Sequence, residues 1–408
     1  MSRPPHVLCA IYPAWGHLLP MLPVVRELVR AGCRVTATAP PELAERLRGL
    51  GAETVPYRTP LDARLPDYTS YANLAEAISV LLDQVLGVAP VIDEACAELL
   101  PDVLVHDIAL TVPGRVLAAK WRRPNVRVLP IFASNEHFSI DAEFAKLAPA
   151  PDPADPPHPA VVRYNEQLVR FLHGHGLSGD EAGAALAGVG EDSVVFMPKL
   201  FQIAGETFGP DHHFVGPSVT EPTEGWAPPE GSGPVVLISM GTSTYYPPEF
   251  FTDCANAFAG SPWHVVIALG TQVDPDELGE LPPNVEVHPW IPIGAVLRHA
   301  SAYLCQGGIS GVMESVHHGT PMVLVPHQPE QIANARRVEE LGLGLVLEEA
   351  TVTPELIRQA VDRLRATEGL DDRMAVVREA GRRAGGPARA AEVIRARAVE
   401  AMQTAPTA

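Results

Sequence analysis

Short apolar segments alternate with helical segments along this chain, and the whole series occurs twice. The first series ends in a proline-rich stretch, EPTEGWAPPEGSGP, and the second begins directly after it with VVLISM. Short apolar strands separated by helices indicate parallel sheets that helices cover on both faces. We therefore expect an α/β protein with two doubly wound, Rossmann-like domains. Such sheets bind ligands at the carboxyl ends of their strands, so we expect the site in a cleft between the domains.

Hydrophobic periodicity predicts the individual elements. The expected strands are 7–12, 34–39, 103–106 and 125–129 in the first series, and 235–240, 265–269, 285–288, 302–305 and 322–325 in the second. The expected helices of the first series are 18–29, 42–50, 112–119 and 161–172.

Two proline-rich stretches bear on where the domains divide. A helical pattern follows the stretch 148–160, so we interpret it as a connection inside the first domain. The predicted organisation is an N-terminal domain at 1–220, a linker at 221–234, a C-terminal domain at 235–385 and a terminal helix at 386–408. Two interpretations of that helix stay open, a solvated end or a return to the N-terminal domain.

Composition limits the classes of partner. Hydrophobic residues make up 46% of the 408 residues and charged residues 19%, which is typical of a soluble globular protein. The formal net charge of −19 argues against nucleic acid or an anionic membrane surface as the main partner. An anionic ligand must then be held by local features such as helix N-termini, which need no net positive charge.

The five cysteines are scattered and form no metal-binding or disulfide spacing, so we expect a reduced, cytoplasmic protein without a metal site. The first apolar run is too short for a secretory signal. We also expect no apolar stretch approaching 18 residues, and hence no membrane-spanning helix and no stable membrane anchoring.

His17 is the first candidate catalytic residue, because it follows a glycine turn at the start of a predicted helix. The positive end of a helix dipole disfavours a protonated imidazole, so His17 is expected to be neutral and able to accept a proton. Asp107 follows the strand 103–106, which ends at the same edge of the sheet. A carboxylate there would orient the imidazole and stabilise its charged form. Taken singly, His17 could merely bond the backbone and Asp107 could merely cap a helix, whereas His106 should face the other side and pack.

In the second series, several strand ends carry residues suited to a nucleotide. The small residues Gly241, Thr242 and Ser243 close a strand where backbone could approach a ligand. Trp290, before Ile291, could stack on a flat base, although core packing is the alternative.

A glycine turn, Gln306-Gly307-Gly308, follows another apolar strand and precedes a helix expected from about Ser310. The amide groups of that first turn, which includes Gly311, can hold a diphosphate. Glu314 lies four residues after Ser310, on the same helical face, where a carboxylate suits ribose hydroxyls. A glycine pair alone is a weak signal.

One further strand is followed by Glu330 and Gln331. An acidic and an amide side chain together can bind sugar hydroxyls. The alternative is an exposed helix start, where Glu is favoured in any case.

The order of these motifs resembles that of the GT-B nucleotide-sugar glycosyltransferases of the antibiotic and macrolide type. The resemblance covers nearly the whole chain and rests on WGHLLPML, PDVLVHDIAL, LISMGTS, PPNVEVHPWIP, QGGISGVMES and PHQPEQIANA. Two further segments, FASNEHFS and SPWHVVIALG, resemble sugar transferases of enediyne biosynthesis, including the calicheamicin type.

The resemblance implies roles for individual residues. It implies a catalytic base at His17 with a supporting carboxylate at Asp107, a base-stacking Trp290 and a ribose-binding Glu314. It implies a sugar-binding pair at Glu330 and Gln331, with Glu where Asp is usual. A hydrophobic acceptor would bind the N-terminal domain, near the residues Trp15, Asn135, Glu136 and Phe138.

Two positions depart from the family pattern. The glycine loop usually opens with a histidine that meets the diphosphate, and here Gln306 stands in its place. The family's Trp-x-Pro-Gln motif ends instead in Ile293, which favours a dTDP-sugar over a UDP-sugar. These departures put the strength of donor binding in doubt.

The implied activity is inverting transfer of a sugar from a dTDP- or UDP-sugar to a hydroxyl group of a hydrophobic natural product, without a metal or another cofactor. Two alternatives stay open. One is another GT-B enzyme, such as a lipid glycosyltransferase or a sugar-nucleotide epimerase. The other is a non-catalytic nucleotide-sugar-binding partner of a true transferase. The sequence leaves open the sugar, the acceptor, a biosynthetic or resistance role, and whether the chain forms a homodimer.

Overall fold

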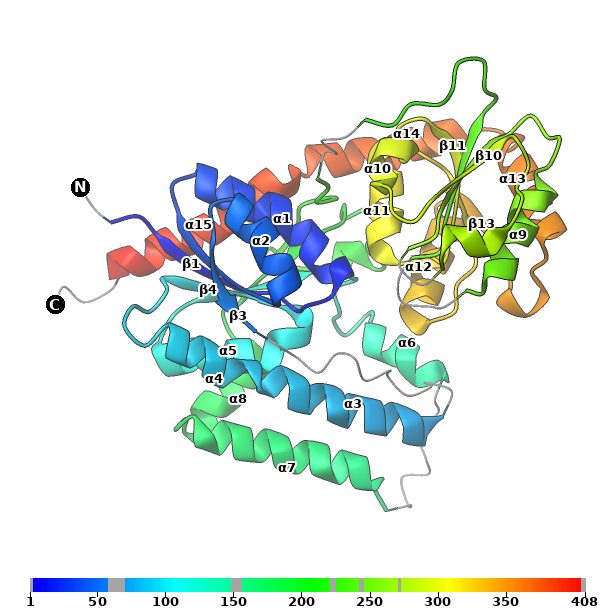
Figure 1. Ribbon diagram of the computed structural model, residues 1–408. Coiled ribbons are helices and arrows are strands. Elements are labelled where there is room, and N and C mark those ends of the chain that lie inside the picture. Colours follow the sequence, from blue (N-terminus) through cyan, green and yellow to red (C-terminus); the bar gives the residue numbers. More distant parts are fainter. Residues whose placement is uncertain are drawn as a thin grey trace. The chain divides into compact units, whose positions relative to one another are not determined.

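A computed structural model describes residues 3–57, 70–147, 156–220, 225–241, 246–270 and 273–404. The chain divides into two compact α/β units (Figure 1). The first unit consists of Met1–Phe196, Glu206–Ser218 and Gly385–Ala408, and the second of Met197–Gly205 and Val219–Ala384. The predicted fold class is therefore confirmed. The structure also assigns residues 197–205 to the second unit and the C-terminal helix to the first.

The first unit is built on a seven-stranded parallel sheet with the order β3-β2-β1-β4-β5-β6-β7. Its strands are β1 (His6–Ala10), β2 (Arg34–Ala39), β3 (Glu53–Pro56), β4 (Val103–Asp107), β5 (Asn125–Leu129), β6 (Asp192–Val195) and β7 (His212–Phe214). Its helices are α1 (Trp15–Arg30), α2 (Pro41–Gly49), α3 (Tyr71–Leu86), α4 (Val88–Ala95), α5 (Thr111–Trp121), α6 (Ile140–Leu147), α7 (Pro159–Gly174), α8 (Gly179–Ala187) and α15 (Gly386–Thr404). The 3-10 helices are η1 (Ile108–Leu110) and η2 (Gly205–Thr207), of which η2 begins on a residue of the second unit.

The second unit is built on a six-stranded parallel sheet with the order β10-β9-β8-β11-β12-β13. Its strands are β8 (Val235–Ser239), β9 (His264–Ala268), β10 (Val285–His288), β11 (Ala300–Cys305), β12 (Met322–Leu324) and β13 (Gly344–Val346). Its helices are α9 (Pro248–Ala257), α10 (Ile293–Leu297), α11 (Ile309–His318), α12 (Pro329–Glu340), α13 (Pro354–Arg365) and α14 (Leu370–Arg383), with 3-10 helices η3 (Pro275–Leu278) and η4 (Glu349–Thr351).

In both sheets the order reverses beside the first strand, which is the point where doubly wound folds bind ligands. In the first unit this point lies between β1 and β4, which pair in parallel. In the second unit it lies between β8 and β11. The topology thus places the ends of β1 and β4 together, and the ends of β8 and β11 together.

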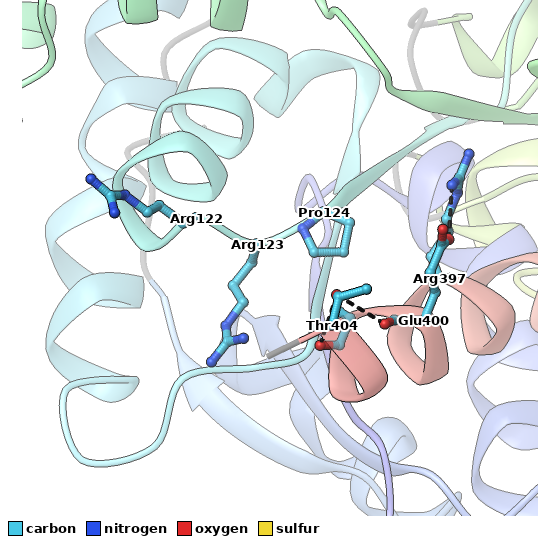
Figure 2. A pocket seen from close by; sticks show the side chains of 7 residues that line it. Arg122, Arg123, Pro124, Arg397, Glu400 and Thr404 are labelled. Atoms are coloured by element: carbon cyan, nitrogen blue, oxygen red, sulfur yellow. Dashed lines mark hydrogen bonds and ion pairs between the residues drawn. The ribbon is translucent and has the colours of Figure 1, made fainter. Parts of the chain in front are cut away.

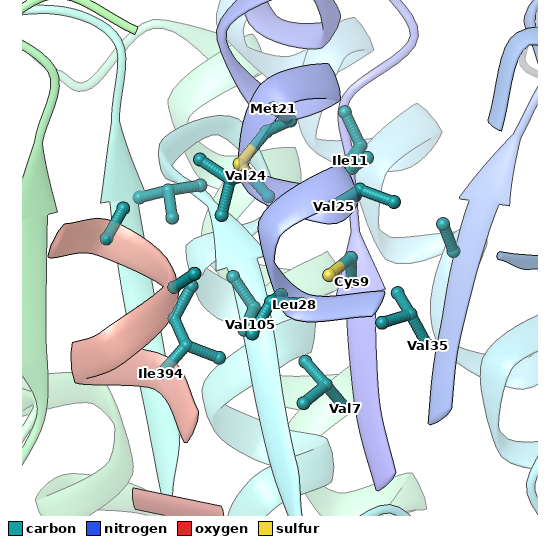
Figure 3. Close-up of a cluster of buried hydrophobic side chains, with 14 of the residues drawn as sticks. Val7, Cys9, Ile11, Met21, Val24, Val25, Leu28, Val35, Val105 and Ile394 are labelled. Atoms are coloured by element: carbon teal, nitrogen blue, oxygen red, sulfur yellow. The ribbon is translucent and has the colours of Figure 1, made fainter. Parts of the chain in front are cut away.

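One face of the first sheet packs under α1 and α15 (Figure 3). Leu28 of α1 and Ile394 of α15 lie with Val105 of β4 in one buried cluster. Burying such a side chain contributes about 1.5–3 kcal/mol. The C-terminal helix therefore completes the core beneath α1, the helix that begins beside His17.

The other face is covered by α3, α4 and α5. One stretch of these helices corrects the expectation that no apolar segment approaches 18 residues. Residues Tyr71–Ala95 form a helical stretch of 25 residues whose most apolar 18-residue window has a mean hydropathy of 1.6, which is long and apolar enough to cross a membrane. Half of its most apolar window is buried within the fold, where Leu82, Val85 and Ile92 belong to a core cluster. Packing against the sheet accounts for its apolar composition.

Candidate functional site

The first candidate site lies at the carboxyl ends of β1 and β4. Helix α1 begins at Trp15, two residues before His17, with Ala14 as its N-cap residue. The sequence predicts a later start at 18 and places Pro20 in the first turn. In the structure Pro20 and Pro23 both lie inside the helix. His17 is therefore held within the first turn of a helix that the core fixes in place.

His17 and Asp107 are brought together by the pairing of β1 with β4. The Nδ1 atom of His17 lies 2.8 Å from Oδ2 and 2.9 Å from Oδ1 of Asp107. Because a carboxylate accepts hydrogen bonds, Nδ1 carries the proton and donates it. In the neutral His17 tautomer that results, Nε2 is unprotonated and has the acceptor character that a general base needs.

Asp107 is buried, whereas the His17 side chain is 24% exposed. Oδ1 of Asp107 also accepts the amide of Ala109 at 2.8 Å, which caps η1 and fixes the carboxylate. The ring of Tyr12 meets the His17 ring edge to face, with centroids 5.2 Å apart. The arrangement can orient an imidazole and stabilise its protonated form, as a base–carboxylate pair requires. The capping alternative for Asp107 is also met, since Asp107 caps a 3-10 helix.

His106 faces away from this pair, as predicted. It is fully buried, and its Nε2 lies 2.8 Å from Oε1 of Glu191. Arg115 donates to the same carboxylate, and these partners lower the pKa of Glu191 to about 2 against the effect of burial. The interpretation of His106 as a packed histidine is confirmed.

The predicted acceptor segment is a turn built around Asn135. Oδ1 of Asn135 accepts the amides of His137 at 2.9 Å and Phe138 at 3.1 Å, while Nδ2 donates to Thr207. Phe138 is buried against Phe132, with ring centroids 5.6 Å apart. The amide group of Asn135 and the ring of Phe138 thus shape the loop itself.

The remaining acceptor candidates lie in different surroundings. Glu136 is exposed to solvent. Trp15 is partly buried against the first core cluster, and the guanidinium of Arg46 lies 5.0 Å from its ring centroid. Of the four acceptor candidates, Glu136 is exposed, Trp15 and Asn135 are half-buried, and Phe138 is buried.

The second candidate site lies at the carboxyl ends of the second sheet. Gly241 follows β8 with a positive φ of 72°, and a Cβ atom there would lie 2.3 Å from Nε2 of Gln306. The loop after β8 and the loop after β11 are therefore in contact, and a larger residue at this position would be strained by the positive φ and would displace the Gln306 side chain. Thr242 and Ser243 lie outside the described residues.

The glycine turn connects β11 directly to α11. Gly307 has a φ of 87°, and a Cβ there would lie 3.2 Å from the carbonyl oxygen of Gln331. Gly308 is the N-cap residue of α11 and has no side chain to cover the first amides. Those amides belong to Ile309, Ser310 and Gly311. A helix N-terminus whose N-cap residue is glycine is suited to an anion such as a diphosphate.

Glu314 lies one turn further along α11 and has a buried carboxylate oxygen, Oε2, without a hydrogen-bond partner in the described structure. Burial raises the pKa of Glu314 to about 7 from its ordinary value of 4.5. A buried acceptor that lacks a donor is costly unless a ligand supplies one. Ribose hydroxyls would supply such donors.

Glu314→Gln is expected to stabilise the ligand-free protein increasingly as pH rises. The folded pKa lies above the unfolded one, so stability from this group is complete below about pH 4.5 and is lost as pH rises through 7. The cost of the buried anion at pH 8 is on the order of 1–3 kcal/mol. Urea unfolding at pH 5 and pH 8 measures it, with exposed Glu339→Gln as the control. A stability difference that stays constant with pH would contradict the assignment.

Trp290 and Ile291 occupy the connection between β10 and α10. Trp290 is 49% exposed, so the core-packing alternative does not describe it. An exposed indole at a strand end can stack on a base. Ile291 is half-buried beside it.

The acidic–amide pair lies in the first turn of α12, but its two side chains differ. Oε1 of Gln331 accepts the amides of His327 at 2.9 Å and Gln328 at 3.1 Å, and the residue is only 3% exposed. It therefore forms the helix cap, which leaves only its Nε2 group to meet a sugar. Glu330 is half-buried, and its Oε1 accepts from Asn334 at 3.3 Å.

Asn334 is a site residue that the sequence analysis missed. It lies one turn after Glu330 in α12, is fully buried, and donates through Nδ2 to the carbonyl of Gly307 at 2.9 Å. The available signal was an amide at a core position of a helix, within the motif PHQPEQIANA.

A pocket of about 310 Å³ lies elsewhere on the first unit, beside the residue that precedes β5 (Figure 2). Arg122, Arg123 and Arg397 line it, but their guanidinium groups point in different directions. It lies at the amino edge of the sheet, opposite His17. Within the described ranges, no group of three His, Cys, Asp or Glu side chains could hold a metal ion. All five cysteines are buried and free.

Comparison with known proteins shows which proteins this chain resembles. Residues 259–396 match the family model described as erythromycin biosynthesis protein CIII-like, C-terminal domain. The chain is 36% identical to demethyllactenocin mycarosyltransferase of Streptomyces fradiae, over 96% of this chain and 86% of that protein. It is 32% identical to oleandomycin glycosyltransferase of Streptomyces antibioticus, over 97% and 91%. The crystal structure of the calicheamicin glycosyltransferase CalG4 matches with a TM-score of 0.85 and 38% identity, over 98% of this chain and 99% of that one.

Proposed function

The chain belongs to the natural-product glycosyltransferases, and from this premise we propose that it moves a sugar from a nucleotide sugar to a hydroxyl group of a hydrophobic natural product with inversion at the anomeric carbon. The observation that carries the proposal is the pair of hydrogen-bond distances between His17 Nδ1 and the buried Asp107 carboxylate. A cytoplasmic location is part of the proposal.

The first unit supplies the base in this mechanism. Nε2 of His17 removes the proton of the acceptor hydroxyl while that oxygen attacks the anomeric carbon from the face opposite the leaving nucleotide. One carbon–oxygen bond forms and the bond to the diphosphate breaks, so the configuration inverts. Asp107 accepts from Nδ1 throughout and stabilises the imidazolium that forms.

The second unit supplies the donor site. The amides at the start of α11 take up the charge that develops on the leaving diphosphate. Glu314 accepts hydrogen bonds from the ribose, and Trp290 stacks on the base. Glu330 binds sugar hydroxyls together with Nε2 of Gln331. The charge on the leaving group is met by helix amides, so the proposal includes no metal.

The nature of the two substrates is proposed from two features. Ile293, at the start of α10, stands where the family's motif ends in Gln, and this favours dTDP over UDP. The names of the relatives refer to demethyllactenocin, oleandomycin and calicheamicin, which supports a natural-product aglycone as acceptor. Trp15 lies in the first turn of α1, two residues before His17, where an apolar acceptor would bind.

Gln306→Ala is expected to weaken dTDP binding several-fold, and Gln306→His to retain or tighten it. Gln306 is buried against Gly241, and its amide donates a neutral hydrogen bond to phosphate where a charged donor would be about twice as strong. Isothermal titration calorimetry measures both affinities. If neither substitution changes them, the side chain does not meet the phosphate.

A thermal-shift comparison of dTDP and UDP tests the donor assignment, followed by mass spectrometry of products across nucleotide sugars and aglycones. We expect dTDP to stabilise the protein more than UDP, and a product heavier than the aglycone by one sugar residue. A protein that neither nucleotide stabilises would overturn the donor site. Nucleotide binding without any product would favour the non-catalytic alternative.

A further inference from the structure

We propose that Asn334 is a positioning residue that aligns the diphosphate loop with the sugar-binding carboxylate of Glu330. The inference rests on the proposed function, because it concerns the donor site described above. Asn334 touches neither the glycine turn's amides nor the reacting atoms. It acts through the two groups to which it donates.

The hydrogen bonds of Asn334 join two loops that follow different strands. Its Nδ2 group donates to the carbonyl oxygen of Gly307 at 2.9 Å and to Oε1 of Glu330 at 3.3 Å. Both partners are acceptors only, so the amide orientation is fixed by its surroundings. One buried NH₂ group thus connects the turn after β11 to the first turn of α12.

The bond to Gly307 determines which way the peptide at the turn points. With its carbonyl held towards α12, the peptide plane is fixed, and so is the direction of the amide that follows, on Gly308. Without that bond, the carbonyl of a glycine with a φ of 87° is free to rotate towards the anion. A carbonyl dipole facing a diphosphate opposes binding, so Asn334 favours the binding-competent loop.

The bond to Glu330 restrains the carboxylate on the same helical face. Residues four apart in a helix are neighbours, and Glu330 is half-buried in the first turn while Asn334 is fully buried. The distance between the diphosphate loop and the sugar-binding group is therefore set by a single side chain that the core immobilises.

Asn284 provides a matched control in the same unit. Its Nδ2 also donates to two oxygens, the carbonyls of Phe258 and Trp263, each at 2.9 Å. Like Asn334, it has a buried Oδ1 without a hydrogen-bond partner in the described structure. Asn284 precedes β10, however, and so lies at the amino edge of the sheet, opposite the donor loops. Replacing Asn284 with alanine should lower the stability of the protein without changing its affinity for the nucleotide.

The test compares Asn334→Ala with Asn284→Ala and the unsubstituted protein. Calorimetry gives the affinity for dTDP and for UDP, and ligand-observed NMR gives the affinity for thymidine and uridine, which lack phosphate. We expect Asn334→Ala to lose about tenfold in diphosphate affinity with nucleoside affinity unchanged, and Asn284→Ala to match the unsubstituted protein within twofold. Donor KM should rise more in Asn334→Ala than in Asn284→Ala.

The possible outcomes separate the two claims. Equal affinities for the two alanine variants, or an equal loss for nucleotide and nucleoside, would overturn the positioning role while the donor site stands. Failure of the unsubstituted protein to bind either nucleotide would overturn the proposed function itself. If Asn334→Ala does not fold, Asn334→Leu keeps the approximate size of the side chain and removes the Nδ2 donor without adding charge, and it carries the same expectation.

Discussion

His17→Ala is expected to lower turnover by about 10²–10⁴-fold, which is the usual contribution of a general base. The side chain lies in the first turn of α1 and is 24% exposed, and its Nδ1 donates to Asp107, so the proposed base is the unprotonated Nε2. Initial rates of product formation measure the loss. Affinity for dTDP should stay within twofold, because the residues of the proposed donor site belong to the other unit.

His6→Ala is the matched control for this substitution. His6 is a buried histidine of β1 whose Nε2 lies 2.9 Å from Thr36, and it sits at the opposite end of the strand from His17. We expect it to lose stability but little turnover. Turnover retained in His17→Ala, or lost equally in both variants, would contradict the assignment of the base.

Asp107→Asn is expected to lower turnover by roughly 10²–10⁴-fold, by analogy with the carboxylate of other base–carboxylate pairs. The asparagine Oδ1 can still accept the amide of Ala109, so the local turn survives. Its NH₂ group then faces His17 Nδ1 and favours the wrong tautomer, and no negative charge balances the imidazolium. Initial rates and their pH dependence measure the change.

Asp102→Asn is the corresponding control, since Asp102 is a buried carboxylate just before β4 that accepts from His6 and Arg3. It should keep turnover near that of the unsubstituted protein. The double variant His17→Ala/Asp107→Asn should be no slower than His17→Ala alone, because Asp107 acts through the imidazole. A full additional loss in the double variant would mean that Asp107 acts independently.

The central strands were predictable because they are continuous apolar runs, as buried parallel strands are. The outer strands β3, β6, β7 and β13 were not. β6 begins with Asp192, whose charge is balanced by Arg397 from the far end of the chain. β13 begins with Gly344, where a Cβ would collide with the carbonyl of Met322. Neither partner is visible in a local window of sequence.

The candidate site was predictable to the extent that strand ends locate it. His17 and Asp107 were expected at one edge, and neighbouring strands bring them into contact. The uses of Asn135 and Gln331 were not foreseen, because both side chains bond backbone amides of their own turns. Such local capping competes with ligand binding for the same polar atoms, and the folded structure decides whether a side chain caps its own turn or faces a ligand.

The anomeric configuration of the glycoside product tests the central claim most directly. A nucleotide sugar of known anomeric configuration is incubated with the enzyme and an aglycone from the product screen, and the anomeric proton of the product is examined by NMR. Attack by a hydroxyl group that His17 activates predicts the opposite configuration to the donor, and no product with His17→Ala. A product that retains the donor's configuration would contradict the mechanism.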